Sequence, residues 1–176
     1  MAYNRIDRAA AEALEAAVGA ENFQIGDQIG ADMSHDERSL YGTAAPEAVV
    51  YPRSTEQVSA VLRICSERSI PVTPRGAGTG LAGGAVPVEG GVVLSTGRMN
   101  AILGIDETNL YADVQPGLRL SELCEAAAAR SLRYCPDPGE RSATVGGNAA
   151  TNAGGPCADR YGSTRENVIG LTAVLA

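Results

Sequence analysis

The chain has 176 residues, including 21 glycines, and a formal net charge of −7 with an isoelectric point near 4.7. This length suits one domain or two small ones and can bury a core without help from disulfides or metals. The negative charge and the lack of a basic stripe argue against binding along a nucleic-acid backbone. A small anion held by backbone N–H groups is still compatible with this charge, because such a site needs no cationic side chains.

The four cysteines and the single histidine indicate no metal site. The cysteines form no C-x-x-C pair, and His35 alone cannot complete a zinc ligand set. The charged N-terminal residues lead into no apolar run, and no stretch approaches the ~20 apolar residues of a membrane span. We therefore expect reduced thiols and a cytoplasmic location, which leaves peripheral association with a membrane open.

The first half of the chain predicts a strand–helix–strand unit. Apolar spacing predicts an opening helix over residues 6–17, followed by an irregular stretch over residues 22–45. A strand over residues 49–51 precedes a capping box, Ser54-x-x-Gln57, and a helix that runs to about residue 68. A second strand over residues 70–73 completes a βαβ unit with a parallel crossover.

The second half predicts a hairpin and a further helix. Residues 92–94 form an expected buried strand, and residues 101–105 and 110–114 an expected hairpin. Helical spacing continues over residues 120–128, and short strands are expected over residues 132–134 and 169–176. Because natural termini are usually polar, the apolar C-terminal stretch is interpreted as a fragment cut inside a fold.

The first of two glycine clusters holds seven glycines between Gly76 and Gly91. Gly78, Gly80 and Gly83 match G-x-G-x-x-G, but a nicotinamide Rossmann site would also need a helix from about Gly80. The following glycines and prolines oppose that helix, so we prefer a nest of backbone N–H groups for a diphosphate, with at least one glycine at positive φ. A turn without ligand is the plain alternative.

The second cluster holds five glycines between Gly139 and Gly155. Residues 137–155 are almost free of large apolar side chains, so a bulky planar ligand could approach the backbone closely. Two such loops, each after a predicted strand, suggest one extended ligand that lies between two lobes.

Several motifs in order resemble a known family. They are Pro74-Arg-Gly-Ala-Gly-Thr-Gly80, Thr144-Val-Gly-Gly-Asn148, Asn152-Ala-Gly-Gly155, Tyr161-Gly-Ser-Thr164 and Asn167-Val-Ile-Gly170, with Asp36 in the lead-in. Together they resemble the FAD-linked oxidases of the vanillyl-alcohol oxidase type, nearest to the D-lactate dehydrogenase and glycolate oxidase flavin subunits. The resemblance covers residues 46–176.

The resemblance implies an α+β fold, a two-lobed FAD-binding domain with a βαβ first lobe and a truncated second lobe. Residues 1–45 would form an N-terminal helix and irregular lead-in, and residues 46–176 an incomplete FAD-binding domain. The rest of the second lobe and the substrate cap domain would be absent.

The family pattern also implies which residues contact FAD. The diphosphate would be cradled by Pro74, Arg75, Gly76, Ala77, Gly78, Thr79, Gly80 and Leu81. The flavin side would be contacted by Asp137, Pro138, Thr144, Gly146, Gly147, Thr151, Asn152, Ala153 and Gly154, and the adenine end by Ile169. The Arg75 side chain could sense the diphosphate charge, or it could be solvated or bridge the two lobes. The sequence favours neither alternative.

Two departures from the family imply non-covalent FAD. Thr79 stands where members with histidyl-bound flavin carry histidine, and Ser142 stands about where others carry the attached cysteine. No catalytic residue and no metal ligand is assigned, because no acid, base or nucleophile has a partner at recognisable spacing. The redox chemistry would belong to the flavin.

The resemblance implies oxidation of a D-2-hydroxy acid, of the lactate or glycolate type, by hydride transfer to flavin. The small hydroxy acid would bind through the missing cap domain, so the fragment itself would be inactive, and a partner subunit or an electron acceptor is left open. The alternative is a non-catalytic binding module or fold remnant that holds no flavin.

Overall fold

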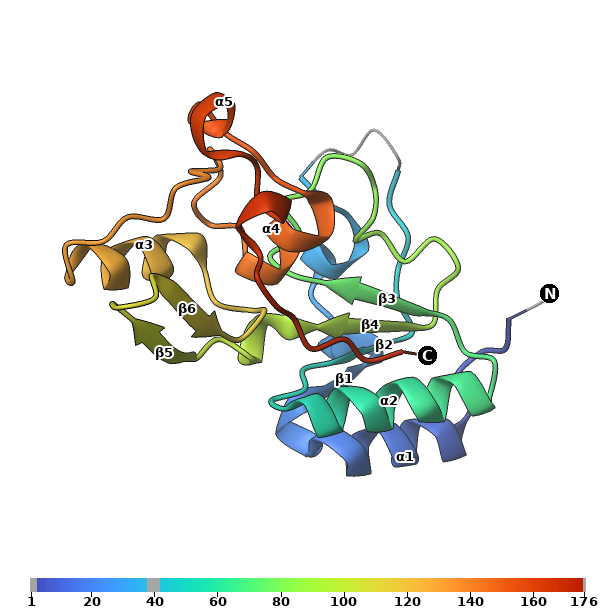
Figure 1. Cartoon of the computed structure of the whole chain (residues 1–176). Coiled ribbons are helices and arrows are strands. Elements are labelled where there is room, and N and C mark those ends of the chain that lie inside the picture. Colours follow the sequence, from blue (N-terminus) through green and yellow to red (C-terminus); the bar gives the residue numbers. More distant parts are fainter. Residues whose placement is uncertain (1–2, 38–41, 176) are drawn as a thin grey trace. The chain divides into compact units, whose positions relative to one another are not determined.

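The computed structural model describes residues 3–37 and 42–175. The chain forms two compact units, one of Met1–Arg98 with Ala173–Ala176 and one of Met99–Thr172. Helices and strands occur in both units (Figure 1). Among the described residues, no helix is long and apolar enough to cross a membrane.

The first unit is built on a four-stranded sheet in the order β1-β2-β4-β3. The strands are β1 (Phe23–Ile25), β2 (Ala48–Val50), β3 (Val72–Arg75) and β4 (Val92–Ser95). β2 and β3 each pair in parallel with β4, and β1 runs antiparallel to β2. The predicted parallel crossover is therefore present, but β4 lies between the two strands that the crossover joins.

Two helices pack on this sheet, α1 (Arg8–Val18) and α2 (Thr55–Glu67) (Figure 1). Leu14 of α1 and Val61 of α2 are fully buried in one cluster with Val50 and Val92 of the sheet. Half of the predicted capping box starts α2: the Ser54 hydroxyl accepts a hydrogen bond from the N–H of Gln57 (3.3 Å). The Gln57 side chain accepts the N–H of Arg53 (2.7 Å) in place of that of Ser54.

The stretch expected to be irregular contains ordered elements. β1 lies within it, followed by 3₁₀ turns over Gly26–Gln28 and Ala31–Ser34. The periodicity gave no sign of β1, because a three-residue edge strand is too short to show alternation. Part of the stretch, residues 38–41, lies outside the described residues.

The second unit begins with the predicted hairpin, β5 (Ile102–Asp106) and β6 (Tyr111–Val114). Asp106 closes the turn, since its carboxylate accepts the N–H groups of Thr108 (2.9 Å) and Asn109 (2.8 Å). The predicted helix follows as α3 (Leu120–Ala128), which buries Leu120 and Leu123.

Two short helices form where the sequence predicted no helix. α4 (Val145–Thr151) forms inside the second glycine cluster, and α5 (Ala158–Tyr161) follows it. The predicted strand over residues 132–134 is wrong, because the chain turns through Ser131 at φ 59° and the N–H of Leu132 returns to the Ala127 carbonyl. The predicted C-terminal strand is also wrong over the described residues 169–175, which form no ladder with any described strand.

Candidate functional site

The first glycine loop begins where β3 ends. Three parallel strands, β2, β4 and β3, point their carboxyl ends to one edge of the sheet, which is where ligands bind in open parallel sheets. Between residues 76 and 91 the described backbone contains turns and no helix. The Rossmann alternative, which required a helix from about Gly80, is therefore contradicted.

The loop presents a row of unused backbone donors. Gly78 adopts φ +76°, as expected of at least one glycine in this loop. The N–H groups of residues 76–82 donate no hydrogen bond to any group in the part of the chain that the structure describes. Consecutive free N–H groups around a left-handed glycine form an anion-binding nest.

Buried side chains hold this loop from behind. The Arg75 guanidinium donates to the backbone carbonyls of His35 (2.7 Å), Asp32 (2.9 Å) and Ala85 (3.4 Å). The Asp36 carboxylate accepts the N–H of Gly83 at 2.7 Å. The lead-in therefore fixes both ends of the loop.

Arg75 explains why residue 78 is glycine. A Cβ placed on Gly78 would lie 2.1 Å from Arg75 Nη2, so the guanidinium occupies the space that a side chain would need. Only 6% of Arg75 is exposed, and burial is the main cause that lowers the pKa of its guanidinium. The solvated place is therefore wrong for this side chain, which ties segments of the first unit together.

The second glycine loop differs, because the N–H groups at the start of α4 are already used. The N–H groups of Val145 and Gly146 donate to the carbonyls of Leu118 (2.9 Å) and Pro116 (2.8 Å). The Thr144 hydroxyl caps α4 by accepting the N–H of Gly147 (3.2 Å). Among the described residues no strand lies between α3 and this loop, contrary to expectation.

Two glycines of this loop are required by packing within the unit. A Cβ on Gly146 would lie 2.6 Å from Pro116 Cβ. A Cβ on Gly155 would lie 1.9 Å from the Asp137 carbonyl oxygen, so the two ends of the loop are in backbone contact. Close approach of another backbone therefore accounts for these small residues without any ligand.

One buried polar group has no partner in the described structure. Asn148 in α4 is 3% exposed, and its Nδ2 makes no hydrogen bond with the described residues. A buried donor without a hydrogen bond lowers the stability of the fold by about 1–3 kcal/mol. The Asn148 amide is therefore a candidate donor to a group that the described residues do not supply. Asn148 lies in the Thr144–Asn148 motif, but its side chain is not among the contact residues that the resemblance implies.

The implied contact residues fall into two groups. Those numbered 74–81 lie together on the first loop. Those of the second unit gather at α4, where Thr144 caps its start, Gly146, Gly147 and Thr151 belong to it, and Asn152 ends it at φ 52°. The backbone of Asp137 contacts Gly155, the residue that follows Gly154 of this group. Ile169 lies apart from α4 in the sequence and is 81% exposed.

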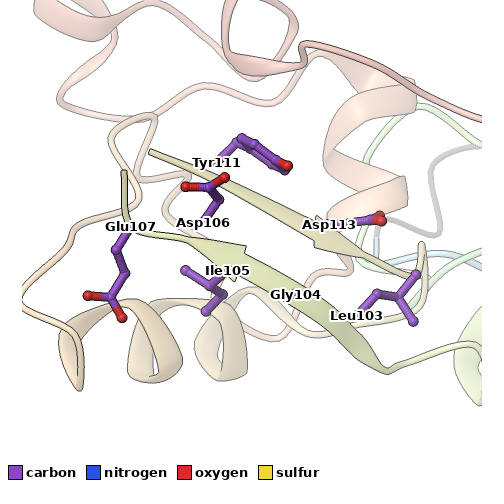
Figure 2. Close-up of a pocket in the computed structure, with 7 residues that line it drawn as sticks. All are labelled: Leu103, Gly104, Ile105, Asp106, Glu107, Tyr111 and Asp113. Atoms are coloured by element: carbon purple, nitrogen blue, oxygen red, sulfur yellow. The ribbon is translucent and has the colours of Figure 1, made fainter. Parts of the chain in front are cut away.

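A surface hollow of about 590 Å³ lies elsewhere, on the β5–β6 hairpin (Figure 2). It contains none of the implied contact residues, and Asp106, Glu107 and Asp113 give it an acidic lining. The Asn109 side chain, which donates to the Asp106 carboxylate (2.9 Å), is the main cause that lowers the pKa of Asp106. That carboxylate is occupied in forming its own turn.

Comparison with known proteins assigns most of the chain to one family. The FAD binding domain family matches residues 46–176. The chain is 52% identical over 151 residues to a D-lactate dehydrogenase of Anaerostipes hadrus, covering 86% of this chain and 32% of that protein. It is 45% identical over 159 residues to the glycolate oxidase subunit GlcD of Bacillus subtilis (strain 168), covering 90% and 34%. The chain thus spans about a third of the length of these curated relatives.

Solved structures show the same fold. An alkyldihydroxyacetonephosphate synthase superposes with a TM-score of 0.83 at 20% identity, covering 96% of this chain and 33% of that one. A p-cresol methylhydroxylase superposes with a TM-score of 0.70 at 26% identity, covering 82% and 29%.

The contacts of Arg75 predict how the first loop responds to substitution. Arg75→Gln should lower the free energy of unfolding by about 2–3 kcal/mol, because partly buried hydrogen bonds to backbone carbonyls lose their charged donor. Gly78→Ala should cost at least as much, since its Cβ displaces the guanidinium and adds roughly 1–2 kcal/mol of backbone strain. In the Arg75→Gln background, Gly78→Ala should add only the strain, because there is no guanidinium left to displace, so the two effects should not add in denaturant unfolding.

Arg8→Gln is the matched control, because the Arg8 side chain is 93% exposed in a surface ion pair. It should change stability by less than about 0.5 kcal/mol. Fully additive effects of Arg75→Gln and Gly78→Ala would refute the contact between the two residues.

Proposed function

The chain belongs to the FAD binding domain family, and from that membership we propose that it is the FAD-holding part of an oxidoreductase that acts on D-2-hydroxy acids such as lactate or glycolate. The expected resemblance and the expected α+β fold of the vanillyl-alcohol oxidase type are both confirmed. The substrate class comes from the names of the relatives.

The proposal rests on the row of N–H groups over residues 76–82, which donate to no group among the described residues. A diphosphate brings charged oxygens, and each hydrogen bond to a charged group contributes about 1.5–3 kcal/mol. Backbone donors suit a chain whose net charge is −7, because they add no cation yet still concentrate positive partial charge at one loop. The residues present therefore fit FAD.

Within the proposal, each unit supplies its own contacts. In the first unit, residues 74–81 hold the diphosphate, and the Arg75 guanidinium shapes the loop from behind, so that residue contributes through its backbone. In the second unit, the residues already named around α4 contact the cofactor, and the Asn148 amide is an additional donor close to them. When bound, the flavin supplies the hydride-acceptor chemistry.

We further propose that the FAD is not covalently attached. Thr79 and Ser142 bear hydroxyl groups at the family's two attachment positions, and the Ser142 hydroxyl donates to Glu140 at 2.6 Å. No cluster of metal-binding side chains occurs among the residues the structure describes. The relatives are about three times as long as this chain. We therefore propose the hydroxy-acid substrate, the group that accepts its proton and the partner subunit for the whole protein.

Ligand preference tests the proposed function. Apo protein should bind FAD at least about a hundredfold more tightly than riboflavin, because riboflavin lacks the diphosphate that two or more loop N–H groups would hold. Flavin fluorescence titration measures both affinities. Gly78→Ala should narrow this preference, whereas Gly84→Ala should keep it, because Gly84 has open space at its Cβ and no positive φ.

If riboflavin binds as tightly as FAD, the diphosphate is not what the loop recognises. If neither flavin binds, the chain is a fold remnant that holds no cofactor. Either result contradicts the proposal.

Acid treatment tests the mode of attachment. FAD bound to this chain should appear intact in the supernatant after acid or heat precipitation, because neither attachment position carries a histidine or cysteine. Absorbance near 450 nm in the supernatant and pellet measures the release. Flavin that stays with the precipitated protein would show a covalent bond and contradict this prediction.

A further inference from the structure

Two half-exposed thiols lie just outside the ends of the second glycine loop. Cys135 stands two residues before Asp137, and Cys157 stands two residues after Gly155. Asp137 and Gly155 are in backbone contact, as shown by the 1.9 Å between a Cβ on Gly155 and the Asp137 carbonyl oxygen. Each thiol is therefore two residues away from the same backbone contact, Cys135 on the Asp137 side and Cys157 on the Gly155 side.

One residue contacts both thiols. The Cys135 thiol donates to the Arg133 carbonyl at 3.7 Å, and Arg133 Nη2 donates to the Cys157 sulfur at 3.3 Å. The same Nη2 lies 3.6 Å from the Asp137 carboxylate. Cys157 is thus held against the short segment, residues 133–137, at whose centre Cys135 lies.

The other two cysteines lie in different surroundings. Cys65 is 1% exposed, and burial raises the pKa of its thiol to about 11. Burial is also the main cause that raises the pKa of Cys124. Because the thiolate is the species that reacts with oxidants, these two thiols should react slowly.

We propose that Cys135 and Cys157 form a reversible oxidation site, in which hydrogen peroxide joins them in a disulfide that fastens the two ends of the second glycine loop. This inference goes beyond the proposed function and does not depend on FAD.

The reaction takes place in two displacements. The Cys157 thiolate attacks one peroxide oxygen, forming an S–O bond and breaking the O–O bond, and hydroxide leaves to be protonated to water. The Cys135 thiolate then attacks the sulfenic sulfur, forming the S–S bond and releasing a second water after proton transfer. Two thiols are oxidised by two electrons in total, and one peroxide is reduced to two waters.

The disulfide would enclose residues 136–156, which include all of α4. In the structure, the ends of this segment are held by the Asp137–Gly155 contact and by the Arg133 side chain, which is exposed. A covalent bond there restricts the conformations open to the segment when it unfolds. The oxidised protein should therefore unfold at a higher temperature than the reduced one.

Peptide mapping gives a direct test, because every cysteine lies on its own tryptic peptide. Cleavage after arginine separates Cys65, Cys124, Cys135 and Cys157. After treatment of the full chain with hydrogen peroxide and blocking of free thiols, we expect residues 134–141 linked to residues 142–160, with the loss of two hydrogens. Dithiothreitol should restore both separate peptides.

Variants supply the controls. Cys124→Ser should leave the cross-link unchanged, whereas Cys135→Ser and Cys157→Ser should each abolish both the cross-link and the rise in unfolding temperature. Circular dichroism before oxidation checks that each variant is folded. A dominant link from Cys124 to either thiol would overturn the proposal, as would sulfinic or sulfonic acid on Cys135 and Cys157 without any cross-link.

Discussion

The buried guanidinium of Arg75 is the contact on which the first glycine loop depends. It satisfies carbonyls of Asp32, His35 and Ala85, which come from segments far apart in the sequence. It also fills the space beside Gly78, so the loop follows a left-handed path there. The lead-in carbonyls therefore help to determine the backbone shape of the loop, in which a row of N–H groups has no partner among residues 3–37 and 42–175. The site is thus a consequence of the packing of Arg75.

The two glycine loops use the same residue type for opposite purposes. In the first loop, glycine permits a positive φ, and the N–H groups over residues 76–82 have no acceptor in the described part of the chain. In the second loop, Gly146 and Gly155 let one backbone touch another, and the N–H groups of Val145 and Gly146 are used within the unit. The first loop is thus suited to an anion, whereas the second is packed within its own unit and contains the buried Asn148 amide, whose Nδ2 has no partner among the described residues.

Local signals in the sequence were enough for elements that depend on near neighbours. The Ser54–Gln57 capping box and the turn around Asp106 predicted α2 and the hairpin, because their hydrogen bonds join residues two or three apart. The order of the sheet could not be predicted this way, since the insertion of β4 depends on packing. α4 was missed because two glycines oppose a helix locally, and the Arg75 contacts were missed because they span about forty residues.

Amide hydrogen exchange with and without FAD tests the central claim, that the free N–H groups of the first loop hold the diphosphate. Without FAD, the amides of residues 76–82 should exchange rapidly, because they have no partner within the described chain. With FAD bound, amides in this row should become protected, while those of Val145 and Gly146, already hydrogen-bonded, should be slow in both states. Protein that carries FAD, as shown by its flavin absorbance, while residues 76–82 exchange as fast as before would contradict the account.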